Sequence, residues 1–287
     1  MNYKSISTGD REMFSAILKN SEVYKNYAAS ELTFQNLFVW GKVQNIQYFT
    51  KNNIIFVKNY FEDSHIILPP LCKTFDELDN ALSAIEKMHE GFTMRGVPEN
   101  IAKRYAARYN FLEDRNLAEY IYNTDDLISL AGAKFHDKKN LVRQFEKYCV
   151  SVSEYNAAEH YQKILSFQNA FNLPQEFQAV QLALDNFDAL DMKCLVFSDG
   201  DKLIAFAAGF ITEFNQGVIM FEKADRNYKG IYAALNNAFV KRFFVTCTSV
   251  NMQEDMGFEG LRKSKLSYNP ISITKKYITY SCVREVN

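Results

Sequence analysis

The sequence contains no long apolar run, few cysteines and no excess of charge of either sign. Its longest uninterrupted apolar stretch, residues 203–211, is about half of the roughly 20 residues that cross a bilayer, so we expect no membrane-spanning segment. Lys and Arg number 33 against 34 Asp and Glu in 287 residues, which argues against a protein that binds a polyanion over its whole surface. Hydrophobic residues make up 47% of the chain, so it is not disordered and can bury a sizeable core.

The cysteines and histidines are too few and too scattered for a disulfide framework or a zinc site. Five cysteines stand far apart without a CxxC pair, at positions 72, 149, 194, 247 and 282. This pattern predicts reduced thiols and, together with the polar N-terminus, a cytoplasmic protein, and it leaves a peripheral position at the membrane surface open. The four histidines include no pair four residues apart, and the sequence has no P-loop, nucleophile elbow or dinucleotide-binding glycine pattern. We therefore expect no metal and no bound cofactor.

Helix and strand patterns alternate along the whole chain, which favours a mixed architecture. A capping box at residues 74–77 predicts the start of a helix, and Asp199-Gly200 between two apolar runs predicts a β-hairpin. Each half contains helices, about three consecutive strands, and then a helix–strand–helix–strand order. This order resembles the GNAT acyltransferase fold used twice. We therefore expect an α+β protein with two fused GNAT-like domains, each a mixed central sheet flanked by helices. Gly132 interrupts a helical pattern and sets the predicted boundary between domains 1–131 and 132–287.

Residues 251–270 form the most distinctive segment for chemistry. From residue 260 to residue 284 there are six basic residues and no acidic one, although the whole chain is nearly neutral. The segment is either a solvated helix face or part of a cleft that gathers acidic and basic groups against an anionic ligand. Its candidate residues are, in chain order, Asn251, Glu254, Glu259, Arg262, Lys263, Lys265 and Tyr268.

A second candidate region, residues 221–232, lies where a strand is expected to end and a helix to begin. Glu222 and Asp225 occupy the charged strand end, and Gly230 precedes the helix. A helix N-terminus offers free backbone amides and the positive end of the helix dipole, which suits an anion. GNAT proteins that bind acetyl-CoA carry a Q/R-x-x-G-x-G/A loop at this place, whereas this chain has Asn227 first and Tyr232 last. The poor match argues against ordinary use of acetyl-CoA.

A third candidate region is a basic run at the predicted domain boundary. Residues 134–147 contain five basic and two acidic residues. Lys134, Lys139 and Asn140 are candidates for contacts with phosphate, although such a run is also typical of an exposed helix face.

Four segments carry a resemblance to a known family: ELTFQNLFVW at 31–40, the junction at 126–140, EKAD at 222–225 and EGLRKSKLSY at 259–268. They are similar to the C-terminal domain of phosphatidylglycerol lysyltransferase, and the likeness extends over nearly the whole chain. That family resembles the Fem-type peptidoglycan aminoacyltransferases in its two fused GNAT-like halves. The resemblance implies transfer of an aminoacyl group from aminoacyl-tRNA to a lipid or another acceptor. The lipid-modifying members also carry a multi-span membrane segment, which this sequence does not show, so the acceptor stays open.

The resemblance leads to predicted roles for the residues named above. Glu222 or Asp225 would hold the α-amino group of the donor or act as general base. Arg262 and Lys265 would bind phosphate or the developing oxyanion, and the hydroxyl of Tyr268 would complete the site. We expect these groups to converge on one cleft, where the cations lower the pKa of the carboxylates. Substrate contacts are expected from Lys134, Lys139, Asn140, Gly230, Asn251, Glu254, Glu259 and Lys263.

Two alternatives to this function stay open. The protein is alternatively an acyl-CoA-dependent GNAT N-acyltransferase, or a non-catalytic ligand-binding member of the same fold. Under the favoured hypothesis aminoacyl-tRNA is the donor substrate, no cofactor is required, and the expected partners are tRNA and a lipid or peptide acceptor.

Overall fold

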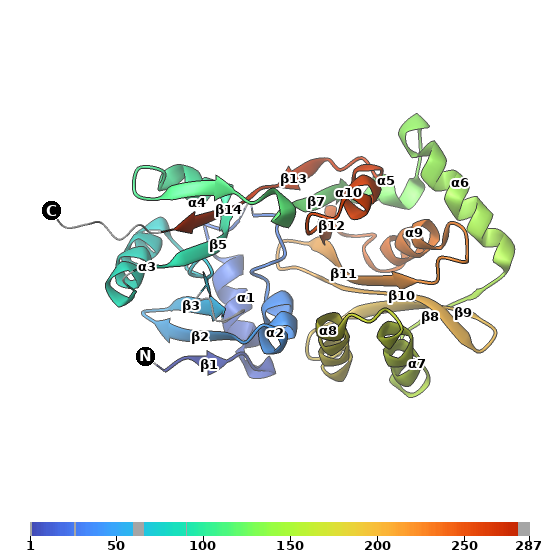
Figure 1. The fold of residues 1–287 in the computed structure, drawn as a ribbon, viewed down its shortest axis with the longest axis horizontal. Coiled ribbons are helices and arrows are strands. Elements are labelled where there is room, and N and C mark those ends of the chain that lie inside the picture. Colours follow the sequence, from blue (N-terminus) through green and yellow to red (C-terminus); the bar gives the residue numbers. More distant parts are fainter. Residues whose placement is uncertain (1, 26, 60–65, 90, 281–287) are drawn as a thin grey trace. The chain divides into compact units, whose positions relative to one another are not determined.

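The computed structural model describes residues 2–25, 27–59, 66–89 and 91–280, which form two compact units (Figure 1). The first unit comprises Met1–Glu119, Glu254–Gly257 and Thr274–Asn287, and the second comprises Tyr120–Gln253 and Phe258–Ile273. The units therefore divide at residue 119 rather than at the predicted residue 131, and the end of the chain returns to the first unit. Gly132 marks only a local helix break. Such a signal does not show that a strand near the end of the chain pairs with strands of the first unit.

The first unit is built on a seven-stranded mixed sheet with the order β1-β2-β3-β4-β5-β14-β6. Strands β4 and β5 are parallel and the other neighbours are antiparallel. Its elements are β1 Lys4–Ser5, the 3₁₀ helix η1 Thr8–Asp10, α1 Arg11–Lys19, α2 Phe34–Val43, β2 Ile46–Lys51, β3 Ile54–Asn59, β4 Ile66–Ile67, α3 Phe75–Met88, β5 Thr93–Pro98, α4 Glu99–Arg104, β6 Asn110–Glu113, η3 Arg115–Leu117 and β14 Lys276–Tyr280.

The predicted capping box is confirmed at the start of α3. The Thr74 hydroxyl accepts from the Glu77 N–H at 3.2 Å, and the Glu77 carboxylate in turn accepts from the Thr74 N–H at 3.4 Å. The two bonds satisfy amides that the first turn of a helix leaves without partners. Helix α3 then buries a stripe of Leu78, Leu82 and Ile85 at three- and four-residue spacing.

A buried ion cluster holds the returning strand β14 in the first unit. Lys276 Nζ lies 2.6 Å from Glu119 Oε1 and 3.0 Å from Glu31 Oε2, and its side chain is only 3% exposed. The other oxygen of Glu119 accepts from the Ser30 N–H at 2.7 Å. Gly96, with φ +70°, leaves room for Glu31, because a Cβ at this position would lie 2.3 Å from Glu31 Oε2. These contacts join four segments that are distant in sequence.

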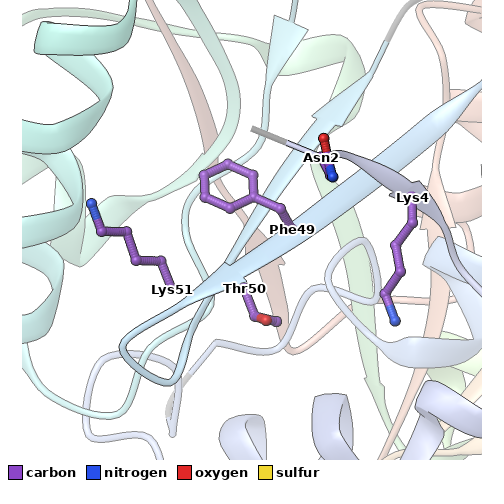
Figure 2. A pocket seen from close by; sticks show the side chains of 5 residues that line it. All are labelled: Asn2, Lys4, Phe49, Thr50 and Lys51. Carbon is purple, nitrogen blue, oxygen red and sulfur yellow. The ribbon is translucent and has the colours of Figure 1, made fainter.

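A shallow hollow of about 390 Å³ lies beside β1 and β2 and is lined by Asn2, Lys4, Phe49, Thr50 and Lys51 (Figure 2). Lys4 is paired with Asp10 at 3.3 Å and lies over the ring of Tyr48. Figure 2 shows Phe49 between the two lysines. The charges on this surface are thus partly satisfied within the first unit.

The second unit is built on a mixed sheet with the order β13-β7-β12-β11-β10-β9-β8. The predicted architecture of two mixed sheets flanked by helices is therefore confirmed. The elements are β7 Glu119–Asn123, α5 Thr124–Ser129, η4 Ala133–Phe135, α6 His136–Phe145, η5 Glu146–Tyr148, β8 Ser151–Glu154, α7 Ala157–Asn169, α8 Pro174–Asp185, β9 Lys193–Asp199, β10 Lys202–Ile211, β11 Gln216–Ala224, α9 Ile231–Phe243, β12 Ser249–Glu254, α10 Glu259–Leu266 and β13 Ser272–Thr274.

Strand β10 lies between β11 and β9 in this sheet, and its residues 203–210 are all buried. It pairs with β9 through the predicted hairpin, with Lys202 opposite Asp199 and Gly200 in the left-handed region at φ +56°. Helices α7 and α8 cover one face of the sheet, and α6 and α9 cover the other (Figure 1). Because side chains alternate along a strand, neighbouring residues of β11 point to different helical layers. Lys223 pairs with Glu176 of α8 at 2.8 Å, which directs Glu222 to the side of α6 and α9.

Strands β11 and β12 are parallel, and their ladder joins residues 216–218 to residues 249–251. Strand β11 continues to Ala224 beyond this ladder. The side chain of Asn251 accepts from the N–H of Gln253 at 2.6 Å, and Gln253 has φ +60°, so β12 leaves the regular strand conformation here. Glu222 therefore lies on a part of β11 that follows its ladder with β12. Among the described residues, no helix is long and apolar enough to cross a membrane.

Candidate functional site

Glu222 is the acidic centre of the candidate site in the second unit. Burial raises the pKa of its carboxyl group to about 7, and the nearby ammonium groups of Lys265 and Lys138 act in the opposite direction. The expectation that cations would hold this pKa low is therefore wrong. Desolvation disfavours the charged form more strongly than the lysines favour it. A carboxyl group in this state exchanges a proton near neutral pH, as a general base or acid must.

Lys265 reaches the site from α10. Its ammonium group donates a hydrogen bond to the carbonyl of Met252 on β12 and lies 6.0 Å from the centre of the Tyr120 ring. The backbone carbonyl of Lys265 accepts from the hydroxyl of Tyr122 at 2.9 Å, which fixes this turn of α10 against β7. A backbone carbonyl of β12, one residue beyond the β11–β12 ladder, thus binds the cation whose charge acts on Glu222.

Tyr268 and Lys138 form the second side of the site. Lys138 Nζ lies 3.8 Å from the centre of the Tyr268 ring, a cation–π contact within a partly dry environment. Burial lowers the pKa of Lys138, while the negative charge of Glu222 opposes this change. Burial and Glu222 both raise the pKa of Tyr268, so its hydroxyl stays protonated at neutral pH. The ring of Tyr268 also packs edge-on against Tyr122 at 6.2 Å.

Lys138 is not among the site residues predicted from the sequence, although the pattern of α6 contains a signal for it. Lys138, Val142 and Phe145 follow one another at four- and three-residue spacing, so the lysine occupies the apolar stripe of an amphipathic helix. A lysine at such a position points toward the core. Its neighbours Lys134 and Lys139, which the basic run suggested instead, are both exposed.

The other predicted residues of η4 and α6 make local contacts. Lys134 pairs with Asp126 at 2.7 Å. The amide of Asn140 lies 2.9 Å from the ring nitrogen of His136, one turn earlier on the same helix.

Asp225 and Gly230 lie in the loop between β11 and α9. Asp225 accepts from the Asn227 N–H at 3.0 Å and pairs with Lys202 at 3.0 Å, and these contacts lower its pKa. At Gly230, with φ +87°, an added Cβ would lie 2.1 Å from the carbonyl oxygen of Leu141 in α6. The glycine therefore allows α6 to approach the start of α9, and this part of the helix N-terminus is occupied by protein.

The remaining candidates differ in accessibility. Arg262 is half-buried, whereas Glu259 and Lys263 are exposed on α10. Asn251 is fully buried and supports the bend in β12. Glu254 belongs to the first unit, where burial raises its pKa against the opposing charge of Lys276.

The site thus combines a carboxyl group that titrates near neutral pH with two ammonium groups and two protonated phenols. Such groups can move a proton from a nucleophile and stabilise negative charge on a carbonyl oxygen, which are the needs of acyl transfer. Within the described ranges no group of three or more His, Cys, Asp or Glu side chains could hold a metal ion. The two units together have the fold of proteins with tandem GNAT-like domains.

The chain belongs to the family "phosphatidylglycerol lysyltransferase, C-terminal", whose model matches residues 24–280. This confirms the family that the four sequence segments indicated. FemX, with 8% identity, a TM-score of 0.61 and 97% of each chain covered, shares the fold alone.

Solved structures and a curated relative are also similar to this chain. A conserved protein of unknown function from Bacteroides thetaiotaomicron has 28% identity and a TM-score of 0.87, with 98% of this chain and 100% of that chain covered. L-PGS from Bacillus licheniformis has 15% identity and a TM-score of 0.70, with 96% and 93% covered, and supports the fold alone. An uncharacterized protein from Mycoplasmoides gallisepticum is 26% identical over 172 residues, 55% of this chain and 54% of that protein. The chain therefore spans about half the length of the curated relative that it matches.

Proposed function

We propose that this protein is an aminoacyltransferase that moves an aminoacyl group from aminoacyl-tRNA to an amine or hydroxyl of a lipid or other acceptor. The observation that carries the proposal is the place of Glu222 on the part of β11 beyond its ladder with β12, where the charges of Lys265 and Lys138 act on its carboxyl group. Membership in the lysyltransferase family supplies the class of reaction.

In the proposed reaction the acceptor nitrogen or oxygen attacks the ester carbonyl carbon of the donor. Glu222, in its carboxylate form, takes the proton that the acceptor loses. The carbonyl oxygen becomes negatively charged, and the ester bond to the ribose breaks as the tetrahedral intermediate collapses. The released ribose oxygen takes the proton back from Glu222. The ester is already activated, so no covalent intermediate with the protein is needed.

The two lysines and Tyr268 stabilise charge in this scheme. The ammonium group of Lys265 lies beside the Met252 carbonyl, where it can exchange that bond for one to the developing oxyanion. Lys138 and the protonated hydroxyl of Tyr268 add further donors on the second side of the site. Arg262, Lys263 and Glu259 on α10 remain candidates for contacts with the nucleotide end of the donor.

The structure of the α9 N-terminus favours aminoacyl-tRNA over an acyl-CoA as donor. A pyrophosphate at this place requires free backbone amides. Here the Lys229 N–H donates to the Tyr148 hydroxyl at 3.2 Å, and the Leu141 carbonyl lies against Gly230. Ligand phosphates would have to displace both contacts. We also place the reaction in the cytoplasm, where charged tRNA is available.

Binding measurements separate the two donors. Isothermal titration of the full chain with acetyl-CoA and longer acyl-CoA thioesters is expected to show no binding at micromolar concentration. Charged tRNA is expected to bind, with uncharged tRNA as the control for the contribution of the aminoacyl group. Micromolar affinity for a CoA thioester would favour the acyl-CoA alternative. Binding of charged tRNA without transfer to any acceptor would favour a non-catalytic member of the fold.

A further inference from the structure

Tyr122 of β7 contacts the candidate site in two ways. Its hydroxyl donates to the backbone carbonyl of Lys265 in α10 at 2.9 Å, and its ring packs edge-on against Tyr268 at 6.2 Å. The side chain is buried. Tyr122 thus holds the segment that supplies both the ammonium group of Lys265 and the phenol of Tyr268.

Helix α10 depends on such contacts because it buries none of its residues. A surface helix is ordinarily held by an apolar stripe that faces the core. Here Leu261 and Leu266 are both exposed, so no such stripe is present. Lys265 instead ties the helix to two strands: its ammonium group donates to the Met252 carbonyl of β12, and its own carbonyl accepts from Tyr122 of β7. Figure 1 shows α10 beside β7 in the second unit.

The hydroxyl of Tyr122 keeps its role as donor over the pH range in which Glu222 titrates. Burial raises the pKa of Tyr122, and the charge of Glu222 acts in the same direction. Tyr120, two residues earlier, points to the same face of the sheet because side chains alternate along a strand. Its ring lies 6.0 Å from the Lys265 ammonium group. Strand β7 therefore contacts Lys265 both at its backbone and at its charged end.

We propose that Tyr122 is a positioning residue for Lys265. Its hydroxyl fixes the backbone of this turn of α10, so that the ammonium group of Lys265 stays where it acts on Glu222 and on the developing oxyanion. The catalytic consequence rests on the proposed transfer reaction. Tyr122 acts through Lys265, because its hydroxyl is bonded to the backbone carbonyl of that residue.

The substitution Tyr122→Phe tests this role because it removes only the hydroxyl. The ring remains against Tyr268, and the Lys265 carbonyl still accepts from the Tyr268 N–H at 3.1 Å, so we expect the variant to fold. Its kcat should fall about five- to tenfold with little change in KM, the kinetic equivalent of one hydrogen bond between neutral groups. Tyr161→Phe is the matched control, because it removes a hydroxyl that donates to Asp185 at 2.7 Å on the other face of the sheet. It should leave kcat unchanged.

A double-mutant cycle identifies the group through which Tyr122 acts. Lys265→Met should lower kcat by at least about 100-fold, the loss of one donor to the oxyanion. In that background Tyr122→Phe should change kcat by less than about twofold, because the ammonium group that it positions is absent. A further loss of about fivefold or more in the Lys265→Met background would overturn the proposal.

The titration of Glu222 gives a second readout, which needs no donor. The ammonium group of Lys265 lowers the pKa of this carboxyl group against the larger effect of burial. The other cations that lower it, Lys138 and Lys223, lie on α6 and β11. A Lys265 that is no longer held in place should therefore leave the pKa of Glu222 higher than in the wild type.

Carbon-13 NMR of carboxyl-labelled glutamate measures this pKa in the full chain, with Glu222 assigned through Glu222→Gln. The pKa should be higher in Tyr122→Phe than in the wild type and unchanged in Tyr161→Phe. An unchanged pKa in Tyr122→Phe would overturn the positioning role. Absence of transfer from any charged tRNA would refute the proposed function instead, and the titration would still decide the role of Tyr122.

Discussion

Replacing Glu222 by glutamine is expected to stabilise the protein at alkaline pH, although the residue lies at the centre of the site. Below pH 4.5 the carboxyl group is protonated in both the folded and the unfolded chain, so it contributes no pH dependence. Between pH 4.5 and about 7 the folded chain keeps a proton that the unfolded chain has released, so stability falls as the pH rises. Above pH 7 the carboxyl group is charged in both states, and the folded chain carries the full free-energy cost of burying that charge. Raising the pKa from 4.5 to about 7 corresponds to a cost of about 3 kcal/mol, an upper value because the site relaxes around the charge.

Urea unfolding followed by circular dichroism measures this effect in the wild type and in Glu222→Gln. The variant should gain stability relative to the wild type by up to about 3 kcal/mol between pH 4.5 and pH 8. Glu176→Gln is the matched control, because Glu176 pairs with Lys223 on the opposite side of the same sheet. It should show no such gain. A Glu222→Gln variant that is less stable than the wild type at pH 8 would refute the argument that burial disfavours this charge.

Three further results are expected. Gly230→Ala should destabilise the protein by more than about 1–2 kcal/mol, because alanine disfavours the left-handed backbone conformation and its Cβ would meet a backbone carbonyl of α6. Thermal unfolding compares this variant with Gly260→Ala. Gly260 lies in a helix with open space around it, so its replacement should be neutral or slightly stabilising. Lys276→Met should cost about 3–5 kcal/mol because it leaves the buried carboxylate of Glu119 and the partly buried carboxylate of Glu31 without their cation. Lys275→Met at an exposed ion pair should instead leave the urea midpoint unchanged. The rate of transfer should rise with pH to a plateau, with an apparent pKa near 7 set by Glu222, and a rate that stays flat from pH 5 to 8 would contradict its role as base.

Local signals in the sequence were enough to predict much of the fold. The capping box at Thr74 and the hairpin at Asp199-Gly200 depend on residues a few positions apart, and both are present in the structure. The return of β14 to the first sheet depends instead on contacts such as that of Lys276 with Glu119, which are far apart in the chain. Periodicity does not reveal such pairings, which is why the predicted boundary near Gly132 differs from the division between the units.

The residues of the site were predictable where local sequence signals indicate them. Glu222 and Lys265 stand in segments with a clear family resemblance, and the structure brings their charges together. The direction of the Glu222 pKa shift was not predictable, because it depends on how much water the folded chain removes. The charge pattern of the basic run does not distinguish Lys138 from Lys139. The position of Lys138 on the apolar side of helix α6 does.

Transfer of a labelled amino acid from a mixture of charged tRNAs is the most direct test of the proposed function. The acceptors offered are an anionic lipid extract and soluble amines, and the product is detected by mass. The wild type and Glu176→Gln should transfer label at similar rates, and Glu222→Gln should be slower by at least about 100-fold, the contribution of a general base. Equal rates for the wild type and Glu222→Gln would contradict the account, and so would transfer from an acyl-CoA with none from any charged tRNA.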